Sequence, residues 1–165
     1  MRTLTARTMF ILSAVGLLVA CSRTAMIQNA VEQQGGTATV SDDGKSMHVQ
    51  TSEGSMDIGN NTLPSDWPTD VPTYTGAQVV YSASVNPQTG QPGQAVVLQT
   101  TDSAQNVADF YKATLKKNGW NVTGTMQGGG TSVMTATKAD RSVTVAISAA
   151  GELTSITLAI ENGNK

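Results

Sequence analysis

The sequence predicts an α+β protein in which one helix covers the apolar face of an antiparallel β-sheet. Three observations support this prediction: an amphipathic helix with clear end signals, strands with alternating apolar residues before and after it, and a proline-rich break that precedes them. The predicted order of the main domain is β-β-α-β-β-β-β, and a small helix with a β-meander precedes it.

The helix is expected between Asp102 and Asn118-Gly119. Asp102 has the position of an N-cap, and Gln105 has that of its capping-box partner. The apolar side chains that share one helical face are Val107, Phe110, Tyr111 and Leu115. Lysines in the last turns match the negative end of the helix dipole, and Asn-Gly is a common stop signal. We therefore expect this helix to bury one face against the sheet.

Strands are predicted where apolar residues recur at every second position. Before the helix, Val79, Tyr81 and Ala83 indicate one strand, and residues 96–100 indicate a second. After the helix, four strands are predicted at 120–127, 132–138, 142–149 and 153–161. The positions assigned to their buried face are Val122, Met126, Val133, Val143, Val145, Ile147, Ile156, Leu158 and Ile160. The alternate positions are mostly Ser and Thr, which predicts a solvated opposite face.

A smaller unit is expected before the main domain. Residues 22–34 indicate a tether and a weak helix, and residues 37–58 indicate a meander whose turns are rich in Asp, Ser and Gly. His48 is the single histidine and is expected on the surface of this meander. Without a second histidine, His48 predicts no metal site.

Prolines at positions 64, 68 and 72 mark a break in composition at residues 59–76. Proline excludes helix and central strand, so an extended, polyproline-like crossover is expected there. Trp67, Val71 and Tyr74 alternate with these prolines. If exposed, they would form an apolar patch for a partner, and they are the candidate binding residues. The favoured alternative is burial, in which they clamp the meander to the main sheet.

The first residues have the features of an export signal. Arg2 and Arg7 are followed by an uncharged, mostly apolar run from 8 to 20, which is shorter than the ~20 residues that span a bilayer. The run ends in Leu18-Val19-Ala20-Cys21, which resembles the bacterial lipobox. That resemblance implies cleavage between Ala20 and Cys21 and attachment of a diacylglyceryl group and further acyl chains, such as palmitate, to Cys21. The alternatives are an ordinary secretory signal or an uncleaved anchor.

The sequence thus divides into five expected segments. They are a signal peptide at 1–20, a lipidated tether with a short helix and a β-meander at 21–58, the proline-spaced crossover at 59–76, the main α+β domain at 77–161 and a tail at 162–165. The expected location is the extracytoplasmic face of a bacterial membrane. This is the outer leaflet of the cytoplasmic membrane, or the outer membrane where the host has one.

Composition argues against several function classes. The full chain has twelve acidic and ten basic residues, and cleavage of the signal peptide would remove Arg2 and Arg7. The mature chain would then carry a net charge of about −4, which predicts no nucleic-acid partner. The chain has no G-x-S-x-G motif and only one cysteine, so neither an enzyme nor a cofactor is expected. The membrane, reached through the lipid, and an envelope protein are the expected partners.

Two segments carry a wider resemblance. Pro68–Ala77, read as Pro-x-Asp-Val-Pro-x-Tyr-x-Gly-Ala, and Phe110–Trp120, read as Phe-Tyr-x-x-x-Leu-x-x-x-Gly-Trp, resemble a group of uncharacterised bacterial lipoproteins and secreted domains. The likeness spans roughly residues 55–160 and implies an envelope location without site residues. The expected function is a lipid-anchored lipoprotein with a non-catalytic structural or partner-binding role. The alternative is a module that binds a small ligand or glycan on its Ser/Thr-rich sheet face.

Overall fold

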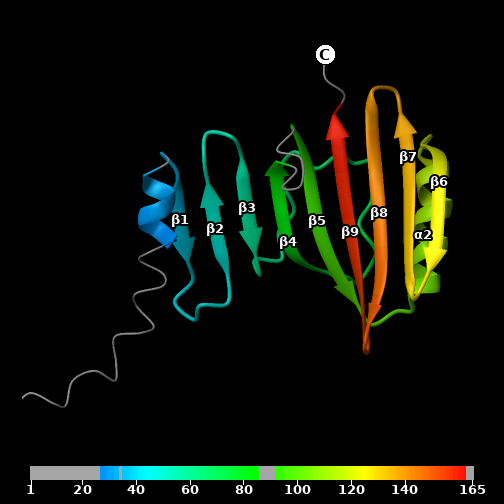
Figure 1. Ribbon diagram of the computed structural model, residues 1–165, viewed down its shortest axis with the longest axis horizontal. Helices are drawn as coiled ribbons and strands as arrows, with labels where there is room; N and C mark the ends of the chain where they lie inside the picture. The colour runs from blue at the N-terminus through cyan, green and yellow to red at the C-terminus, as the bar shows by residue number, and fades with distance from the viewer. Residues whose placement is uncertain (1–26, 34, 86–91, 163–165) are drawn as a thin grey trace, which may run out of the picture.

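The computed structural model describes residues 27–33, 35–85 and 92–162, and it contains one antiparallel sheet of nine strands. The strands lie in the order β1-β2-β3-β4-β5-β9-β8-β7-β6, and helix α2 packs on one side of the β6 end (Figure 1). The predicted α+β class with an antiparallel sheet is confirmed.

Chain order and sheet order agree from β1 to β5 and differ after β5. A helical segment at 27–32 comes first, and the remaining elements are β1 (Thr37–Val40), β2 (Met47–Gln50), β3 (Ser55–Ile58), β4 (Gln78–Val85), β5 (Pro92–Thr100), α2 (Ala104–Lys117), β6 (Asn121–Gly128), β7 (Thr131–Lys138), β8 (Arg141–Ala150) and β9 (Leu153–Asn162). All neighbouring strands pair antiparallel, and β9 inserts between β5 and β8.

The N-terminal meander extends the main sheet directly. Strand β3 pairs with β4, with Met56 opposite Ala83 and Ile58 opposite Tyr81. The Gly59 amide donates to the Val80 carbonyl at 3.0 Å. Gly59 has φ +70°, and a Cβ there would lie 2.4 Å from a backbone oxygen, so only glycine fits this junction. The meander is therefore joined to the sheet by a backbone ladder.

Helix α2 begins one residue later than its sequence signals predict. Ser103 is the N-cap, and its side chain accepts a hydrogen bond from the Asn106 amide. The Asp102 carboxylate instead accepts a 2.6 Å hydrogen bond from the Tyr74 hydroxyl. The helix ends at Asn118, and Gly119 follows with the positive φ that a left-handed stop requires.

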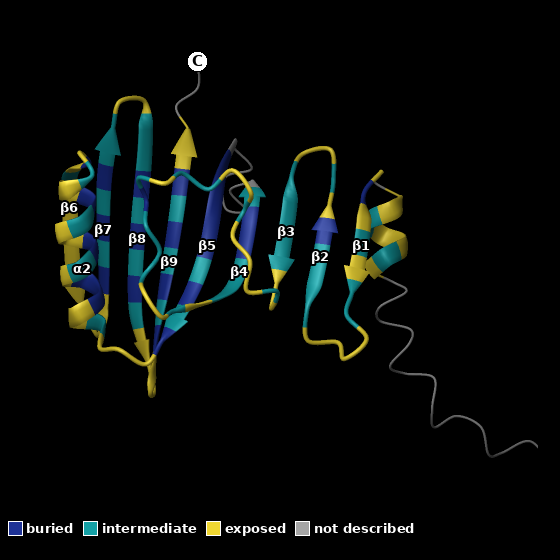
Figure 2. Ribbon diagram, turned by 180° about the vertical axis from the view of Figure 1, so that it is seen from behind, coloured by how far each residue is buried: buried dark blue, intermediate teal, exposed yellow. Residues whose placement is uncertain are grey.

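The core lies between the sheet and two covering segments, α2 and the crossover. Figure 2 shows both on the same side of the strands, and we call this side the covered face. The fully buried side chains there come from both layers: Val71, Val107, Tyr111 and Leu115 above, and Val96, Leu98, Val143, Val145, Ile147, Ile156 and Leu158 below. Burial of this one continuous core drives the fold.

Two predicted positions of the buried face are wrong. In β7, Met134 and Ala136 point into the core, and Ser132 is only 8% exposed, so Val133 lies on the opposite side. The register decides this, because Met134 pairs with the core residue Val145. In β6, the ladder shifts between Val122 and Gly124, and Met126 beyond the shift is 76% exposed. A β-bulge reverses the side on which later residues lie.

Candidate functional site

The side of the sheet opposite α2 carries two neighbouring rows of mostly apolar side chains. We call this side the open face, and it is turned to the viewer in Figure 1. Cross-strand partners give the first row as Met47, Ile58, Tyr81, Val97, Thr157, Ala146, Val133 and Met126. The second row is Val49, Met56, Ala83, Ala95, Ala159, Thr144 and Thr135. The first row thus crosses the sheet from β2 to β6, and the second crosses it from β2 to β7.

A register shift in β4 creates this continuity. Val79 pairs with Leu98 and packs on the core, whereas Tyr81 pairs with Val97 on the other side. The irregularity between Val79 and Tyr81 therefore moves the apolar series of β4 from the covered face to the open face. The meander strands follow Tyr81 through Ile58, so their apolar side chains join the open face as well.

The open face has no charge in its centre. Neither row contains Asp, Glu, Lys, Arg or His, and a third row on the same side, Gln99, Ser155, Ser148 and Thr131, is also uncharged. Acidic side chains stand at the margins, with Glu53 in the β2–β3 turn and Glu161 near the end of β9. An uncharged centre with a polar margin is typical of protein interfaces.

A shallow hollow marks the meander half of the open face. It has a volume of about 220 Å³, and its apolar lining comes from Val49, Met56, Tyr81 and Ala83. Burial raises the pKa of the Tyr81 phenol above its ordinary value of 10.0, so this group stays neutral at physiological pH. The exposed Glu53 also lines the hollow, which therefore combines an apolar lining with one acidic side chain.

The three candidate residues of the crossover lie on the covered face. Val71 is fully buried, and the half-buried side chains of Trp67 and Tyr74 pack against the same core. The indole of Trp67 donates a 2.7 Å hydrogen bond to the Val71 carbonyl, and the Tyr74 ring meets Phe110 edge to face at 5.0 Å. These residues fasten the crossover onto the main domain, whereas the β3–β4 ladder joins the meander.

The crossover is turned rather than extended as the sequence predicts. The Trp67 amide donates to the Pro64 carbonyl at 3.0 Å, and the Val71 amide donates to the Pro68 carbonyl at 3.1 Å. Each of these two prolines thus supplies the first carbonyl of a four-residue turn. The two consecutive turns bring Asp70 to the ends of α2 and of the β7–β8 hairpin.

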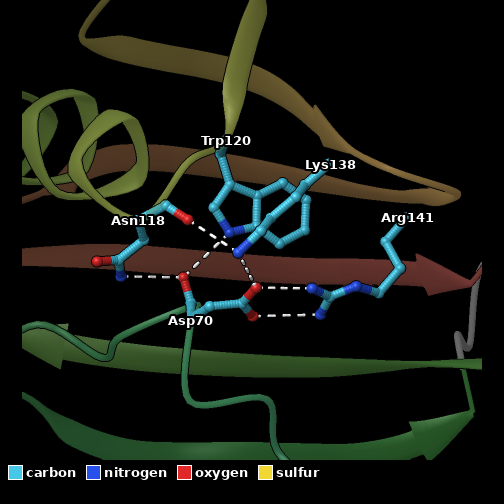
Figure 3. Close-up of polar contacts among 5 residues, drawn as sticks. All are labelled: Asp70, Asn118, Trp120, Lys138 and Arg141. Atoms are coloured by element: carbon cyan, nitrogen blue, oxygen red, sulfur yellow. Dashed lines mark hydrogen bonds and ion pairs between the residues drawn. The ribbon is translucent and has the colours of Figure 1, made fainter.

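Asp70 is the centre of a polar network at that point (Figure 3). Its carboxylate accepts hydrogen bonds from Lys138 at 2.7 Å and from both terminal nitrogens of Arg141 at 2.6 and 3.2 Å. Its backbone carbonyl accepts from the Trp120 indole at 3.0 Å and from the Asn118 amide at 3.1 Å. The Arg141 guanidinium also lies 5.0 Å from the centre of the Trp120 ring. These contacts tie the crossover to the end of α2 and to the β7–β8 hairpin, so we assign the network a structural role.

The network sets the charge state of Asp70. The Asp70 pKa lies below its ordinary value of 3.8, and the hydrogen bonds from Arg141 are the largest cause. Lys138 lowers this pKa further, whereas partial burial of the carboxylate raises it. The same contact with Asp70 raises the pKa of Arg141. Both groups are therefore charged at neutral pH, and the ion pair holds the crossover in place.

The single histidine belongs to a row that does not form a catalytic triad. The Nδ1 atom of His48 lies 2.8 Å from the Asp57 carboxylate, and Ser82 on β4 is the cross-strand partner of Asp57. Asp57 thus stands between the histidine and the serine, whereas a triad requires the histidine to contact the nucleophile. His48 is half-buried on a meander strand.

The lipobox residues Ala20 and Cys21 lie outside the described residues. In the described part of the chain, none of the helices has the length and apolar character needed to cross a membrane. Over the same residues, no group of three or more His, Cys, Asp or Glu side chains is placed to hold a metal ion.

Comparison with known proteins gives one similarity. The family described as START domain-like matches residues 79–157, slightly less than half of the chain. The matched stretch begins in β4, includes α2 and ends in β9. No curated protein and no solved structure matches the chain. The similarity therefore covers the main α+β part and leaves out the meander and the crossover.

Proposed function

We propose that this chain is a lipid-anchored envelope lipoprotein whose main domain is a non-catalytic binding module. START-like domains are typically binding modules, which supports the binding role. The space between α2 and the sheet is filled by fully buried side chains such as Tyr111, Leu115 and Leu158. Binding is therefore assigned to the surface of the molecule rather than to its interior.

The open face is the observation that carries this proposal. Its two rows place bulky apolar side chains such as Met56, Ile58 and Tyr81 beside one another on β3 and β4. Ile58 is 37% exposed, although buried isoleucine is the rule in a folded protein. Contiguous apolar surface without charge marks an interaction site in soluble proteins. A surface of this breadth is best suited to binding another protein.

Placing one charge in the open face should abolish partner binding. Val97 is a half-buried residue of the central strand β5, and Thr157 is its neighbour on β9. In full-length protein solubilised from its own envelope, Val97→Lys or Thr157→Lys should reduce the amount of co-purified partner at least about tenfold, because a lysine would be desolvated in the interface. Gln50→Lys, an exposed position of β2 on the covered side, is the matched control. Unchanged capture by both open-face variants, once denaturant melts show that they are folded, would refute the proposal.

The anchor is tested separately through Cys21. We expect Cys21→Ser to lose all incorporation of a radiolabelled fatty acid and to accumulate as precursor or as soluble protein. Each buried acyl CH₂ contributes ~0.8 kcal/mol to membrane binding, so loss of several chains should release the domain completely. Ser22→Ala leaves the thiol intact and should remain labelled. Label that persists in Cys21→Ser would show that the lipid is attached elsewhere.

A glycan or small polar ligand is the second candidate. It is favoured by hydroxyl pairs on the β7–β8–β9 half of the open face, where Thr135 lies opposite Thr144 and Ser148 lies opposite Ser155. Hydroxyl pairs of this kind can hydrogen-bond a sugar. Calorimetric titration with soluble oligosaccharides of the envelope distinguishes the candidates: saturable heat that Thr144→Val removes supports the glycan, whereas protein capture lost in Val97→Lys supports the protein partner.

A further inference from the structure

The open face is divided into a bulky half and a small half. On β2, β3 and β4 the two rows carry Met47, Val49, Met56, Ile58 and Tyr81 among their members. On β9 and β8 the same rows carry Ala159, Thr157, Thr144 and Ala146. Strand β5 lies between the halves, with the half-buried Val97 and the buried Ala95 on this side of the sheet. The difference in size holds for the strands next to β5, where Ile58 and Tyr81 on one side contrast with Ala146 and Thr157 on the other, whereas Val133 on β7 and Met126 on β6 are bulky again.

We propose that the occupant of the open face is a second copy of this chain, packed sheet to sheet about a twofold axis that runs along β5. This inference rests on the proposed function, because it names the partner of the same surface. A rotation about an axis parallel to the strands turns the bulky half of one copy toward the small half of the other. The interface is then isologous, with the same surface contributed by both copies.

The register predicts which residues face one another. With the axis over β5, Ile58 on β3 lies above Ala146 on β8 of the other copy, and Tyr81 on β4 lies above Thr157 on β9. Packed sheets are separated by ~10 Å, a distance that suits a large side chain facing a small one. An axis perpendicular to the strands would instead place Ile58 against Ile58 and leave the small halves apart. Side-chain size therefore selects the first axis.

The available area is modest. Two rows cross the seven strands from β2 to β7, a width of ~29 Å, and the third row crosses only the four strands from β5 to β7, a width of ~14 Å. At ~7 Å per row the footprint is ~500 Å² per copy and ~1,000 Å² in total, which is near the minimum for a biological interface. The helical segment 27–32 borders this footprint at β1, where Val31 lies against Gly36.

Charge does not oppose this packing. The three rows contain no Asp, Glu, Lys, Arg or His, so the centre of one copy brings no like charges against the centre of the other. Anchoring both copies to one membrane would raise their effective concentration and so favour an interface of modest size. The anchored form is therefore expected to dimerise more completely than a soluble form.

The experiment uses thiol crosslinking in envelopes that contain the full-length chain. A residue on the axis faces its own copy, so Val97→Cys alone should give a product of twice the monomer mass with a short bifunctional thiol reagent. Ile58→Cys alone should stay monomeric. Ile58→Cys and Ala146→Cys, expressed together with different tags, should give a mixed dimer. The natural chain, whose only cysteine is Cys21, is the control for crosslinks through Cys21 and should stay monomeric under the same reagent.

Each outcome decides between the alternatives. Dimers of Val97→Cys together with mixed Ile58–Ala146 dimers support the proposed packing. Dimers of Ile58→Cys alone would overturn the axis, and monomers in every combination would overturn self-association. If the chain stays monomeric but Val97→Lys still loses a captured protein of another sequence, this inference fails and the proposed function stands. If the chain stays monomeric and Val97→Lys still captures its partner normally, both this inference and the proposed binding function fail.

Discussion

Replacing Tyr111 with alanine is expected to lower the free energy of unfolding by about 3–5 kcal/mol. Tyr111 is fully buried between α2 and the sheet, and its ring meets that of Phe110 edge to face at 5.1 Å. Removing it loses the transfer free energy of a large ring and leaves a cavity that rigid strands below it cannot fill. Urea denaturation followed by circular dichroism measures the change.

Two further variants separate this explanation from a general effect of mutating α2. Tyr111→Phe keeps the ring and removes a hydroxyl that has no hydrogen-bond partner in the described part of the chain, so a change within about 1 kcal/mol is expected. Phe110→Ala should cost clearly less than Tyr111→Ala, because Phe110 is only half-buried at the margin of the core. Equal losses at positions 110 and 111 would contradict the observed packing of α2.

Replacing Asp70 with alanine is the second change for which we expect a large effect, a loss of about 2–3 kcal/mol. The carboxylate receives hydrogen bonds from two cationic side chains and is only 22% exposed. Its removal leaves Lys138 and Arg141 partly buried without their acceptor. Their residual access to water keeps the loss below that of a fully buried pair. Asp66→Ala, at an exposed position of the preceding turn, is the control and should stay within about 0.5 kcal/mol.

The same ion pair predicts a pH dependence with a defined sign. The pKa of Asp70 is lower in the folded protein than its ordinary value of 3.8. The folded state therefore holds its proton less tightly, and the stability that Asp70 contributes is present above the ordinary pKa and lost as pH falls through the lowered one. The stability of Asp70→Asn should decline less between pH 5 and 2 than that of the natural chain. Parallel curves for the two proteins would show that the pair does not contribute.

Periodicity and end signals in the sequence predict strands such as β8 and helix α2, because these elements are determined mainly by neighbouring residues. The alternation of Val143, Val145 and Ile147 marks β8, and the apolar spacing that includes Tyr111 and Leu115 marks α2. Asn118-Gly119 also ends the helix as predicted. In each case the deciding interactions lie within one turn or one strand, so the residues of that segment are sufficient evidence.

The errors arise where pairing between strands overrides local alternation. Val133 and Met134 are both apolar, and only the register with β8 decides that Met134 points into the core. The shifts beside Val79 and Val122 reverse the side of the residues that follow them, such as Tyr81 and Met126. A bulge of this kind has no strong sequence signature, so a period-two pattern read through it fails.

Sequence reasoning predicts only the Ser/Thr-rich part of the open face, for the same reason. Its members come from the meander, from β4 after its shift and from the Ser/Thr-rich positions of the C-terminal strands, which pattern analysis treats separately. Aromatic residues on a proline-rich segment are typical of a binding site, which is why the sequence predicts one at Trp67 and Tyr74. In the structure both side chains pack against the core. Asp70 carries no motif, and its role depends on Lys138 and Arg141, 68 and 71 residues away.

The most direct test of the account is the reactivity of a thiol at position 97 in the intact envelope. If the open face is a binding surface, Val97→Cys should react slowly with a small maleimide in the envelope and readily after solubilisation and dilution, because dilution separates the partners. Gln50→Cys, exposed on the covered side of β2, should react equally under both conditions. Equal reactivity of Val97→Cys before and after solubilisation would contradict the account and leave the open face a solvated surface.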